Sequence, residues 1–503
     1  MSNDTKKIQY STNYYGSENL IDPTSLVAKF RNIIDNRAAR LILSKFTKDQ
    51  KGLEHLLAVF AGVEKPSNLI ESAEVKTIDT IFATGAKVFG VNSLDALKSW
   101  LKEPYIRKAI ALTLRSVVIY GITRPQRFAA PLLVVWNFTK ACNLRCMHCY
   151  ANALQGHPAP GELTLEQKLK VIDILDQAGV TMIAFSGGEP LMSRDFWIVA
   201  DYASKKGFYT SIATNGTLLS PSVVDRLTKI GIKYVEISLD ALSPEVHNKF
   251  RGQPKAWERT VEGIKNVVSK GVFDTAMAVT ATKLNYEEID DLLDFAIKLG
   301  VKKFIVFNFV PTGRGKDIIN LDLSPKEREE LLQRLYEKWQ KLTGIDVFST
   351  SPTYSRIGVE RVLGKLGMKY APSHFAYIDT SVPEGVELSE FIGGCGAGRV
   401  YIALEDNGDI EPCVYLPIKV GNIIKDDFME IWNNSKVFND LRDRDKLWDA
   451  CKSCPFKYVC GGCRARAYSY YGDYLAPDPG CILNERYYNE ILASFNLTGV
   501  RSK

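Results

Sequence analysis

Long hydrophobic runs are missing from this sequence. No stretch of about 18 uncharged apolar residues occurs, which is the length that a membrane-spanning helix requires. The first residues, MSNDTKKIQYSTNYYGSEN, are polar where a secretory signal would carry an apolar segment. These absences argue against a membrane-spanning or secreted chain, and we expect a cytoplasmic protein.

Cysteine is also scarce, with 10 residues in 503, so the chain is not a disulfide-stapled scaffold. Because the cytoplasm is reducing, cysteines that cluster in the sequence are expected to bind metal or to take part in redox chemistry. The sequence has no internal repeat and no low-complexity segment. Apolar residues make up 46% and charged residues 24%, which excludes a mainly disordered or fibrous chain and predicts one large domain with one or two smaller ones.

Charge of one sign is in small excess, and the excess is local. The whole chain carries a net charge of +6, and residues 1–130 alone hold 19 Lys and Arg against 12 Asp and Glu. This N-terminal excess fits either an ordinary solvated face or a surface for an anionic partner, such as phosphate head groups or an acidic peptide. No recognisable nucleic-acid-binding module accompanies it, so we do not expect nucleic acid as a partner.

Residues 24–122 carry apolar side chains at helical spacing. We expect helices over residues 24–46, 53–63, 69–91 and 94–122. They predict an all-helical N-terminal domain over residues 23–125, after a flexible leader over residues 1–22. The last stretch includes AIALTLRSVVIYGI, in which Arg115 is the only charge. That segment either packs in a core or forms a surface that meets lipid or a hydrophobic substrate.

From residue 126 the sequence changes to short apolar runs that alternate with amphipathic segments, a pattern typical of a parallel sheet built from strand and helix units. We expect strands over residues 132–138, 182–185, 209–213, 233–237, 275–279 and 304–309. Six such units predict an α/β fold, a partial (β/α)6 TIM-like barrel over residues 126–345. We expect an irregular connecting segment over residues 346–394, a cysteine-rich domain over 395–485 and a C-terminal tail over 486–503.

Three of the ten cysteines lie in the segment KACNLRCMHC, directly after the first expected strand. The spacing of Cys142, Cys146 and Cys149 allows them to share one loop. A structural zinc site takes four protein ligands, whereas three thiolates can hold an iron–sulfur cluster and leave one iron open for a substrate or cosubstrate. The segments SGGEP, TNGT, SLDA and NFVPTGRG follow later strands. In a β/α barrel the loops after the strands carry the functional groups, so we expect a functional site at that mouth.

The Cys-x3-Cys-x2-Cys motif with SGGEP downstream resembles the radical S-adenosylmethionine (radical SAM) enzymes over roughly residues 131–315. The resemblance implies that Cys142, Cys146 and Cys149 are the catalytic centre and hold a [4Fe-4S] cluster whose fourth iron binds the amino and carboxylate groups of SAM. It also implies that Glu189 and the backbone at Gly187 and Gly188 meet the SAM amino group. Further positions match the family's SAM contacts, with ordinary loop capping as the alternative: Ser238, Asp240 and Arg251 at the ribose and carboxylate, Thr214 and Asn215 along the mouth, and His148 against the adenine.

The remaining seven cysteines resemble the SPASM extension of the same family. By itself, the block Cys-x2-Cys-x5-Cys-x2-Cys is equally typical of a zinc ribbon. The resemblance implies two auxiliary iron–sulfur clusters of the [4Fe-4S] type. The first would be held by Cys395, Cys413 and Cys463, with one iron open or bound by an unidentified ligand, and the second by Cys451, Cys454, Cys460 and Cys481. The family more often has three residues between the last two cysteines of the block, where Cys460 and Cys463 enclose two.

The resemblance implies an oxygen-sensitive, oxidoreductase-type enzyme. In such enzymes a reduced cluster cleaves SAM to a 5′-deoxyadenosyl radical, which abstracts hydrogen from the substrate. Auxiliary clusters imply that the substrate is then oxidised, for example by C–C bond formation or dehydrogenation. We expect a reducing partner such as ferredoxin or flavodoxin.

The N-terminal domain lies outside the resemblance and bears on the substrate. Peptide-maturing members commonly carry a small winged-helix domain with strands there, whereas this segment is expected to be helical. Its apolar helices and positive charge favour a bulky hydrophobic substrate, a lipid or a tetrapyrrole, and a peripheral membrane contact through these helices. A peptide or protein substrate is the alternative. An alternative of another class is a non-catalytic iron–sulfur electron carrier or a zinc-bound scaffold.

Overall fold

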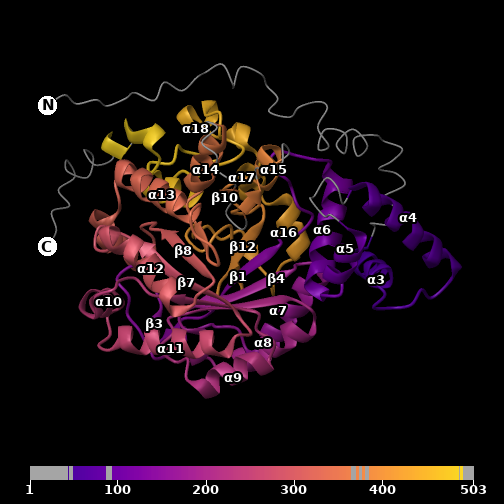
Figure 1. Cartoon of the computed structure of the whole chain (residues 1–503), viewed down its shortest axis with the longest axis horizontal. Coiled ribbons are helices and arrows are strands. Elements are labelled where there is room, and N and C mark those ends of the chain that lie inside the picture. The colour runs from indigo at the N-terminus through magenta and orange to yellow at the C-terminus, as the bar shows by residue number, and fades with distance from the viewer. Residues whose placement is uncertain are drawn as a thin grey trace.

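The computed structural model describes residues 44, 49–85, 93–363, 370–372, 377–379, 385–486 and 488–490. The expected leader, the expected helix over 24–46 apart from Ser44, and most of the expected C-terminal tail lie outside the described residues. Figure 1 shows the described elements arranged around one central sheet, with N-terminal helices on one side and the C-terminal region across one end.

Six parallel strands form the centre of the molecule, and they are the six that the sequence predicts. They pair side by side in chain order. Their bounds are β1 (Leu133–Thr139), β4 (Met182–Gly187), β5 (Tyr209–Thr214), β6 (Tyr234–Ser238), β7 (Asp274–Ala281) and β8 (Lys303–Asn308). The predicted α/β fold with a mostly parallel central sheet is confirmed.

Alternate residues of these strands face opposite sides of the sheet. On β1, Val134, Trp136 and Phe138 are fully buried in the core on the outer side, while Leu133 and Val135 line a cavity on the inner side. The outer side is covered by helices (Figure 1). Their bounds are α7 (Leu165–Ala178), α8 (Phe196–Lys205), α9 (Pro221–Lys229), α10 (Pro244–Arg251), α11 (Ala256–Lys270), α12 (Ile289–Leu299) and α13 (Pro325–Trp339).

The sheet extends beyond the six strands at both edges. β9 (Asp346–Ser349) pairs in parallel with β8, and β12 (Tyr401–Leu404) pairs in parallel with β1. β13 (Asp409–Glu411) pairs antiparallel with β12, and β14 (Gly421–Asn422) pairs antiparallel with β13. The C-terminal cysteine-rich region therefore shares the sheet of the barrel, although its strands lie more than 260 positions after β1 in the sequence.

The expectation of an irregular segment over residues 346–394 was wrong for its described part. This part contains β9, α14 (Thr353–Leu363), the antiparallel pair β10 (Tyr370–Pro372) and β11 (Tyr377–Asp379), and α15 (Gly385–Ile392). β9 has only four residues, too few for an alternating pattern to stand out in a sequence. Its position is fixed by pairing with β8 rather than by its own composition.

The described N-terminal residues are helical, as expected. They form α3 (Gln50–Phe60), α4 (Leu69–Gly85), α5 (Leu94–Trp100) and α6 (Pro104–Tyr120), which share a small core of their own. The single helix expected over 94–122 is two helices, because the chain turns after Trp100 and Pro104 starts α6 at a position that favours proline.

Helix α6 also packs against the barrel. Leu112 belongs to the main core, and the Lys108 ammonium forms a buried ion pair with Asp176 of α7. The apolar segment of α6 is thus partly in the core, while Ile119 is 51% exposed. Among the described residues no helix is long and apolar enough to cross a membrane.

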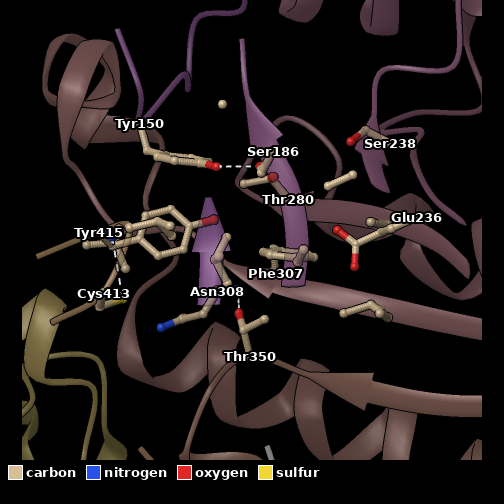
Figure 2. Close-up of a pocket in the computed structure, with 18 of the residues that line it drawn as sticks. Tyr150, Ser186, Glu236, Ser238, Thr280, Phe307, Asn308, Thr350, Cys413 and Tyr415 are labelled. Carbon is tan, nitrogen blue, oxygen red and sulfur yellow. Dashed lines mark hydrogen bonds between the residues drawn. The ribbon is translucent and has the colours of Figure 1, made fainter. Parts of the chain in front are cut away.

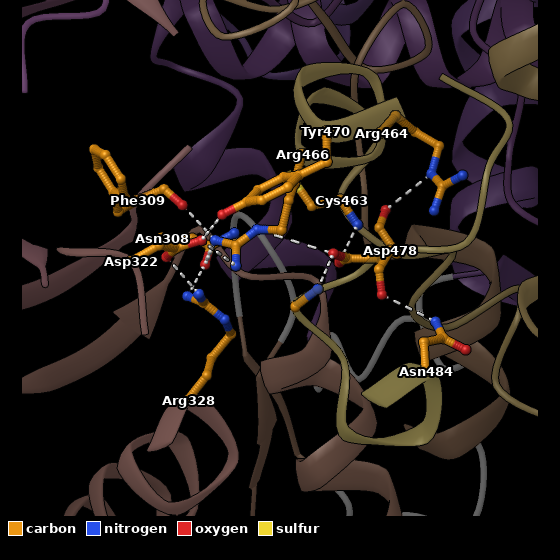
Figure 3. A network of polar contacts seen from close by, with 12 residues as sticks. Asn308, Phe309, Asp322, Arg328, Cys463, Arg464, Arg466, Tyr470, Asp478 and Asn484 are labelled. Carbon is orange, nitrogen blue, oxygen red and sulfur yellow. Dashed lines mark hydrogen bonds and ion pairs between the residues drawn. The ribbon is translucent and has the colours of Figure 1, made fainter. Parts of the chain in front are cut away.

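The cysteine-rich region closes one end of the barrel with α16 (Phe428–Asn434), α17 (Lys436–Arg442), α18 (Asp449–Ser453) and α19 (Arg464–Tyr471). A buried polar network joins α19 to the end of β8 (Figure 3). The Arg466 guanidinium donates to Asn308 Oδ1 and to the Phe309 carbonyl. Arg328 donates to Asp322 at 2.7 Å, and Tyr470 donates to the other oxygen of that carboxylate at 2.7 Å.

Candidate active site

A cavity of about 570 Å³ occupies the inside of the barrel. Side chains from the strands, from the loop after β1 and from the cysteine-rich region line it. The expected site residues in its lining are Cys142, Cys146, His148, Cys149, Gly187, Gly188, Thr214, Asn215, Ser238, Arg251, Cys395, Cys413 and Cys463. Two groups of three cysteines, far apart in sequence, therefore border one cavity.

The first group lies in the loop between β1 and α7, which contains the short parallel pair β2 (Ala141–Cys142) and β3 (Leu154–Gln155). Cys142, Cys146 and Cys149 are free thiols that pack in one small cluster. Burial raises the pKa of Cys142 to about 12 and also raises the pKa of Cys146. Cys142 and Cys146 are thus neutral thiols at pH 7, and they become thiolates when a bound cation supplies positive charge.

Arginine and backbone contacts hold this loop in place. The Arg314 side chain donates to the Cys146 carbonyl at 3.0 Å and to the Ala153 carbonyl at 2.8 Å. On the other side, Met147 N donates to the Phe250 carbonyl at 2.9 Å. Arg314 lies in the NFVPTGRG segment after the sixth expected strand, but nothing in the sequence indicated that it would bind the cysteine loop.

Gly187 and Gly188 lie where the end of β4 passes the cysteine loop. A Cβ atom on Gly188 would lie 2.2 Å from the Ala141 carbonyl oxygen. Gly187 has a φ of +109°, and a Cβ there would lie 2.7 Å from the Thr139 carbonyl oxygen. Only glycine allows this close approach of the two backbones.

Glu189 is the residue whose side chain is expected to meet SAM. It is fully buried behind the cavity lining, and its carboxylate accepts hydrogen bonds from Thr214 Oγ1 and Asn215 N, each at 2.9 Å. The side-chain amide of Asn215, through Nδ2, in turn donates to Asn143 Oδ1, within the cysteine loop, at 2.8 Å. Leu191 N also donates to the Glu189 carboxylate, at 3.2 Å. Burial raises the pKa of Glu189 to about 7, against these three donors, which favour its charged form. The structure thus places Glu189 behind Thr214 and Asn215.

Asp240 also lies behind the lining, paired with Arg251. Its Oδ2 accepts from Arg251 Nε at 2.6 Å and its Oδ1 accepts from Thr280 N at 2.9 Å. The same guanidinium reaches Cys146 Sγ with Nη1 at 3.8 Å. Despite the cost of burial, Arg251 keeps the pKa of Asp240 below its usual value. A buried, charged arginine therefore faces the first cysteine group.

His148 and Ser238 both line the cavity. The His148 ring stacks on Phe250, with ring centroids 4.1 Å apart and an interplanar angle of 14°. Burial lowers the pKa of His148 to about 3, so the ring is neutral at pH 7. Its Nδ1 atom is buried without a hydrogen-bond partner among the described residues.

The middle of the cavity contains residues that the sequence did not single out (Figure 2). Tyr150 donates to Asn137 Oδ1 at 3.2 Å and shares a hydrogen bond with Ser186 Oγ at 2.9 Å. Its ring meets the Tyr415 ring edge to face, with centroids 4.9 Å apart. This ring contact links the first and the second group of cysteines, because Tyr150 directly follows Cys149 and Tyr415 lies two residues after Cys413. They make this part of the cavity aromatic.

The second group consists of Cys395, Cys413 and Cys463, which belong to one hydrophobic cluster. Tyr401 donates to Cys413 Sγ at 2.7 Å, and the Asp478 carboxylate accepts from Cys463 N at 2.7 Å (Figure 3). Burial raises the pKa of Cys463 to about 12.

The third group lies further from the barrel and contains Cys451, Cys454, Cys460 and Cys481, whose thiols influence one another electrostatically. Asn484 Nδ2 and an Arg464 nitrogen lie 3.5 Å and 3.8 Å from Cys451 Sγ. Among the described residues, no three Cys, His, Asp or Glu side chains converge on a single ion. A cluster is bound differently, since each thiolate binds its own iron.

Comparison with known proteins agrees with this arrangement. The model of the radical SAM superfamily matches residues 136–296, and that of the SPASM iron–sulfur cluster-binding domain matches residues 395–455. The chain is 38% identical over 354 residues to an AdoMet-dependent heme synthase of Methanosarcina barkeri, covering 70% of this chain and 97% of that protein. It is 30% identical over 360 residues to a mycofactocin maturase of Mycobacterium tuberculosis, covering 70% and 83%.

A solved structure shares the fold. The crystal structure of Streptococcus suis SuiB bound to the precursor peptide SuiA aligns with a TM-score of 0.59 at 20% identity, covering 85% of this chain and 92% of that one. The two matched domains imply SAM, a [4Fe-4S] cluster and auxiliary iron–sulfur clusters as cofactors, as predicted. The chain is therefore an enzyme of the radical SAM superfamily that carries a C-terminal SPASM domain.

Proposed function

We propose that the three groups of cysteines hold the three clusters. Cys142, Cys146 and Cys149 hold the [4Fe-4S] cluster that binds SAM through its open iron. Cys395, Cys413 and Cys463 hold the first auxiliary cluster, and the third group, Cys451, Cys454, Cys460 and Cys481, holds the second. The donor set supports this proposal, because all ten cysteines are free and seven have pKa values raised by burial, so that they require a cation to ionise.

The contacts proposed for SAM follow from what lines the cavity beside the first group. The backbone at Gly187 and Gly188 meets the amino group, and Ser238, Arg251 and His148 line the same cavity. Glu189 and Asp240 act indirectly, since Glu189 fixes Thr214 and Asn215, and Asp240 fixes Arg251. This modifies the expectation from the sequence, in which both carboxylates touch SAM.

When bound, the reduced cluster supplies the electron that breaks a C–S bond of SAM and so generates the 5′-deoxyadenosyl radical. The chain's own residues limit the access of water to this step, because Cys142 is buried and Cys146 and Cys149 are partly buried. A reducing partner such as ferredoxin or flavodoxin supplies the electron that reduces this cluster.

We propose that the substrate is a bulky hydrophobic molecule, a tetrapyrrole in the first place, which loses hydrogen and is then oxidised. The observation that carries this proposal is one aromatic-lined cavity that both Cys142 and Cys413 border. A molecule in it can lose a hydrogen atom near the first group and an electron to the cluster of the second. The 38% identity to a heme synthase favours a tetrapyrrole over a lipid.

A peptide or protein is the second candidate. The 30% identity to a mycofactocin maturase favours it. The described N-terminal residues argue against a strand-containing leader-binding domain of the kind expected for a peptide maturase, because residues 49–85 and 93–125 contain helices and turns only. A peripheral membrane contact stays a prediction, and Leu69 and Ile70 on α4, 89% and 72% exposed, are the side chains to test.

The test is to trace hydrogen from the substrate into 5′-deoxyadenosine. The reduced enzyme is incubated anaerobically with SAM and with two fractions of an extract from cells grown on deuterated medium. One fraction contains tetrapyrroles, and the other contains small peptides. Deuterated 5′-deoxyadenosine with the tetrapyrrole fraction alone supports the first candidate. Deuterium transfer with the peptide fraction alone replaces it with the second. No 5′-deoxyadenosine with any fraction contradicts the proposed function.

A further inference from the structure

Polar side chains line the inside of this barrel between the cysteines and the opposite end of the strands. The interior of a β/α barrel is ordinarily filled by bulky branched apolar side chains. Here Glu236, Tyr234, Asp274 and Lys303 all line the cavity. None of the roles proposed above uses them, so their presence in an apolar interior calls for an explanation.

Glu236 lines the cavity from β6. Figure 2 shows its carboxylate pointing inward from β6, in the same region of the cavity as Thr280 and Phe307. One oxygen, Oε2, accepts a hydrogen bond from the Tyr234 hydroxyl at 3.3 Å. Burial raises the pKa of Glu236 to about 7, so both protonation states are accessible near neutral pH.

These polar residues form a line that continues from Tyr234 to the residues at which β7 and β8 start. Lys303 Nζ lies 5.6 Å from the centroid of the Tyr234 ring and forms an ion pair with Asp274. Asp274 and Lys303 are the first residues of β7 and β8. Their side chains are 34% and 26% exposed, and two residues near the strand starts are also exposed, Lys302 directly before β8 and Val272 two residues before β7. The line therefore runs from the centre of the cavity to the end of the barrel opposite the first group of cysteines.

Other titratable groups face Glu236 from the surrounding elements. Tyr150 and Tyr415 face it from the cysteine side, and their hydroxyls have pKa values that are raised by burial and, to a smaller extent, by the charge of Glu236. Tyr209 of β5 interacts with Tyr234 from the neighbouring strand. All three are neutral donors at pH 7, so Glu236 is the group in this set with a pKa suited to accept a proton there.

We propose that Glu236 is a catalytic residue that accepts the proton lost by the substrate as it is oxidised, and that Tyr234 and the Lys303–Asp274 pair pass this proton to solvent at the start of the strands. The inference rests on the proposed function. The 5′-deoxyadenosyl radical takes one hydrogen atom from a substrate C–H bond. The resulting substrate radical loses a proton from a second C–H bond to the Glu236 carboxylate and gives one electron to the oxidised auxiliary cluster. Three electrons are involved, two from the broken C–H bond and one from the radical. Two of them form the new double bond, and the third is the electron that the cluster accepts.

The location explains why such a path is useful. The cavity must exclude water on the side where the radical forms, yet every turnover that forms a double bond by breaking a second C–H bond releases a proton. A path through the far end of the barrel removes the proton without opening the side that carries Cys142. Lys303 Nζ lies over the face of the Tyr234 ring, and we infer that ordered water carries the proton from the Tyr234 hydroxyl to the Lys303–Asp274 pair.

The test compares Glu236→Gln and Tyr234→Phe with matched controls. Tyr286 and Glu330 form a tyrosine–glutamate hydrogen bond of the same length, 3.3 Å, on the exposed outer side of the barrel. Glu330→Gln and Tyr286→Phe therefore make the same chemical changes outside the cavity. All variants are purified anaerobically as holoenzyme, and iron content and circular dichroism establish that they fold and load their clusters.

The first readout is the ratio of oxidised product to 5′-deoxyadenosine, with an iron porphyrin that carries carboxylate side chains, or with whichever extract fraction the wild type converts. We expect Glu236→Gln to form 5′-deoxyadenosine while this ratio falls about 100-fold, the usual contribution of a general base. Tyr234→Phe should lower it less, and the controls should not change it. Wild-type product formation should rise with pH through about 7, because only the carboxylate can accept a proton, and this dependence should vanish in Glu236→Gln.

The second readout needs no substrate. Infrared difference spectra of the holoenzyme should contain a protonated-carboxyl band that titrates near neutral pH and disappears in Glu236→Gln. The comparison with Glu236→Gln is required because burial also raises the pKa of Glu189 to about 7, so that Glu189 would contribute a similar band. A wild-type product ratio and pH profile in Glu236→Gln overturn the inference and leave the proposed function intact. A wild-type enzyme that forms no 5′-deoxyadenosine overturns both.

Discussion

Arg251 and Asp240 form a buried ion pair, with Nε and Oδ2 2.6 Å apart, directly behind the cysteine loop. Their side chains are 9% and 1% exposed. The pair holds a positive charge within 3.8 Å of Cys146 Sγ, so its integrity affects both the stability of the barrel and the environment of the first group of cysteines.

Asp240→Asn should destabilise the protein strongly. It leaves the Arg251 charge buried without its carboxylate, which costs about 3–5 kcal/mol of unfolding free energy. Denaturant unfolding of the holoenzyme measures this. The control is Asp201→Asn, because Lys205 and Asp201 also lie 2.6 Å apart but are 73% and 34% exposed, and we expect a loss below about 1 kcal/mol. Equal losses in the two variants would contradict the role given to the buried pair.

Gly188→Ala should prevent the cysteine loop from taking its position. The new Cβ would meet the Ala141 carbonyl oxygen at 2.2 Å, and we expect a cost of at least about 2 kcal/mol together with loss of the SAM-binding cluster. Iron content and thermal unfolding are the measurements. Gly52→Ala in α3 is the control, since its nearest neighbour is a flexible Asp49 oxygen at 3.3 Å and the change should stay within about 1 kcal/mol. Full cluster loading in Gly188→Ala would show that the loop tolerates the shift.

Arg466→Met should loosen the attachment of the cysteine-rich region to the barrel. Arg466 bonds the Asn308 side chain and the Phe309 carbonyl across the two regions (Figure 3). Amide hydrogen exchange in α19 and at the end of β8 should rise, corresponding to a loss of about 3 kcal/mol. Arg486→Met is the matched control, because Arg486 pairs with Asp449 at 2.8 Å in the same region but is 63% exposed. Unchanged exchange in Arg466→Met would rule out this attachment.

Tyr401→Phe should lower the reduction potential of the first auxiliary cluster. The hydroxyl donates to Cys413 Sγ at 2.7 Å, and hydrogen bonds to cluster sulfurs stabilise the more negative, reduced state. A redox titration followed by electron paramagnetic resonance measures the potential. Tyr458→Phe removes an exposed hydroxyl that donates to Asp445 at 3.4 Å, and it should leave the potential unchanged. A potential that does not move in Tyr401→Phe would indicate that Cys413 is not a ligand.

Much of the fold could be predicted from the sequence because its signals are local. Each of the six central strands is a short apolar run with its own flanking helices, and the first group of cysteines spans only eight residues. The sequence could not predict which segments pair when they lie far apart in the chain. β12 joins β1 across more than 260 residues, and Lys140 of the cysteine loop pairs with Glu405 just after β12. Neither contact leaves a periodic pattern in either segment.

The roles of individual side chains depended on orientation, which sequence patterns do not fix. Glu189 lies in the expected segment, yet its carboxylate turns toward Thr214 and Asn215 rather than into the cavity. Conversely, Glu236 lies two residues before Ser238, and alternation along β6 places both in the cavity lining. That alternation was the available signal for Glu236, and it becomes informative only once the inner face of β6 is known.

The most direct measurement is the formation of 5′-deoxyadenosine by the reduced protein with SAM, compared between two cysteine variants. Replacing Cys142, Cys146 and Cys149 together by alanine should abolish it while the iron and sulfide of the auxiliary clusters remain. Cys395→Ala, which alters only the second group, should still form it. Continued cleavage of SAM by the triple variant would contradict the assignment of the open iron to this loop, and with it the account of the active site.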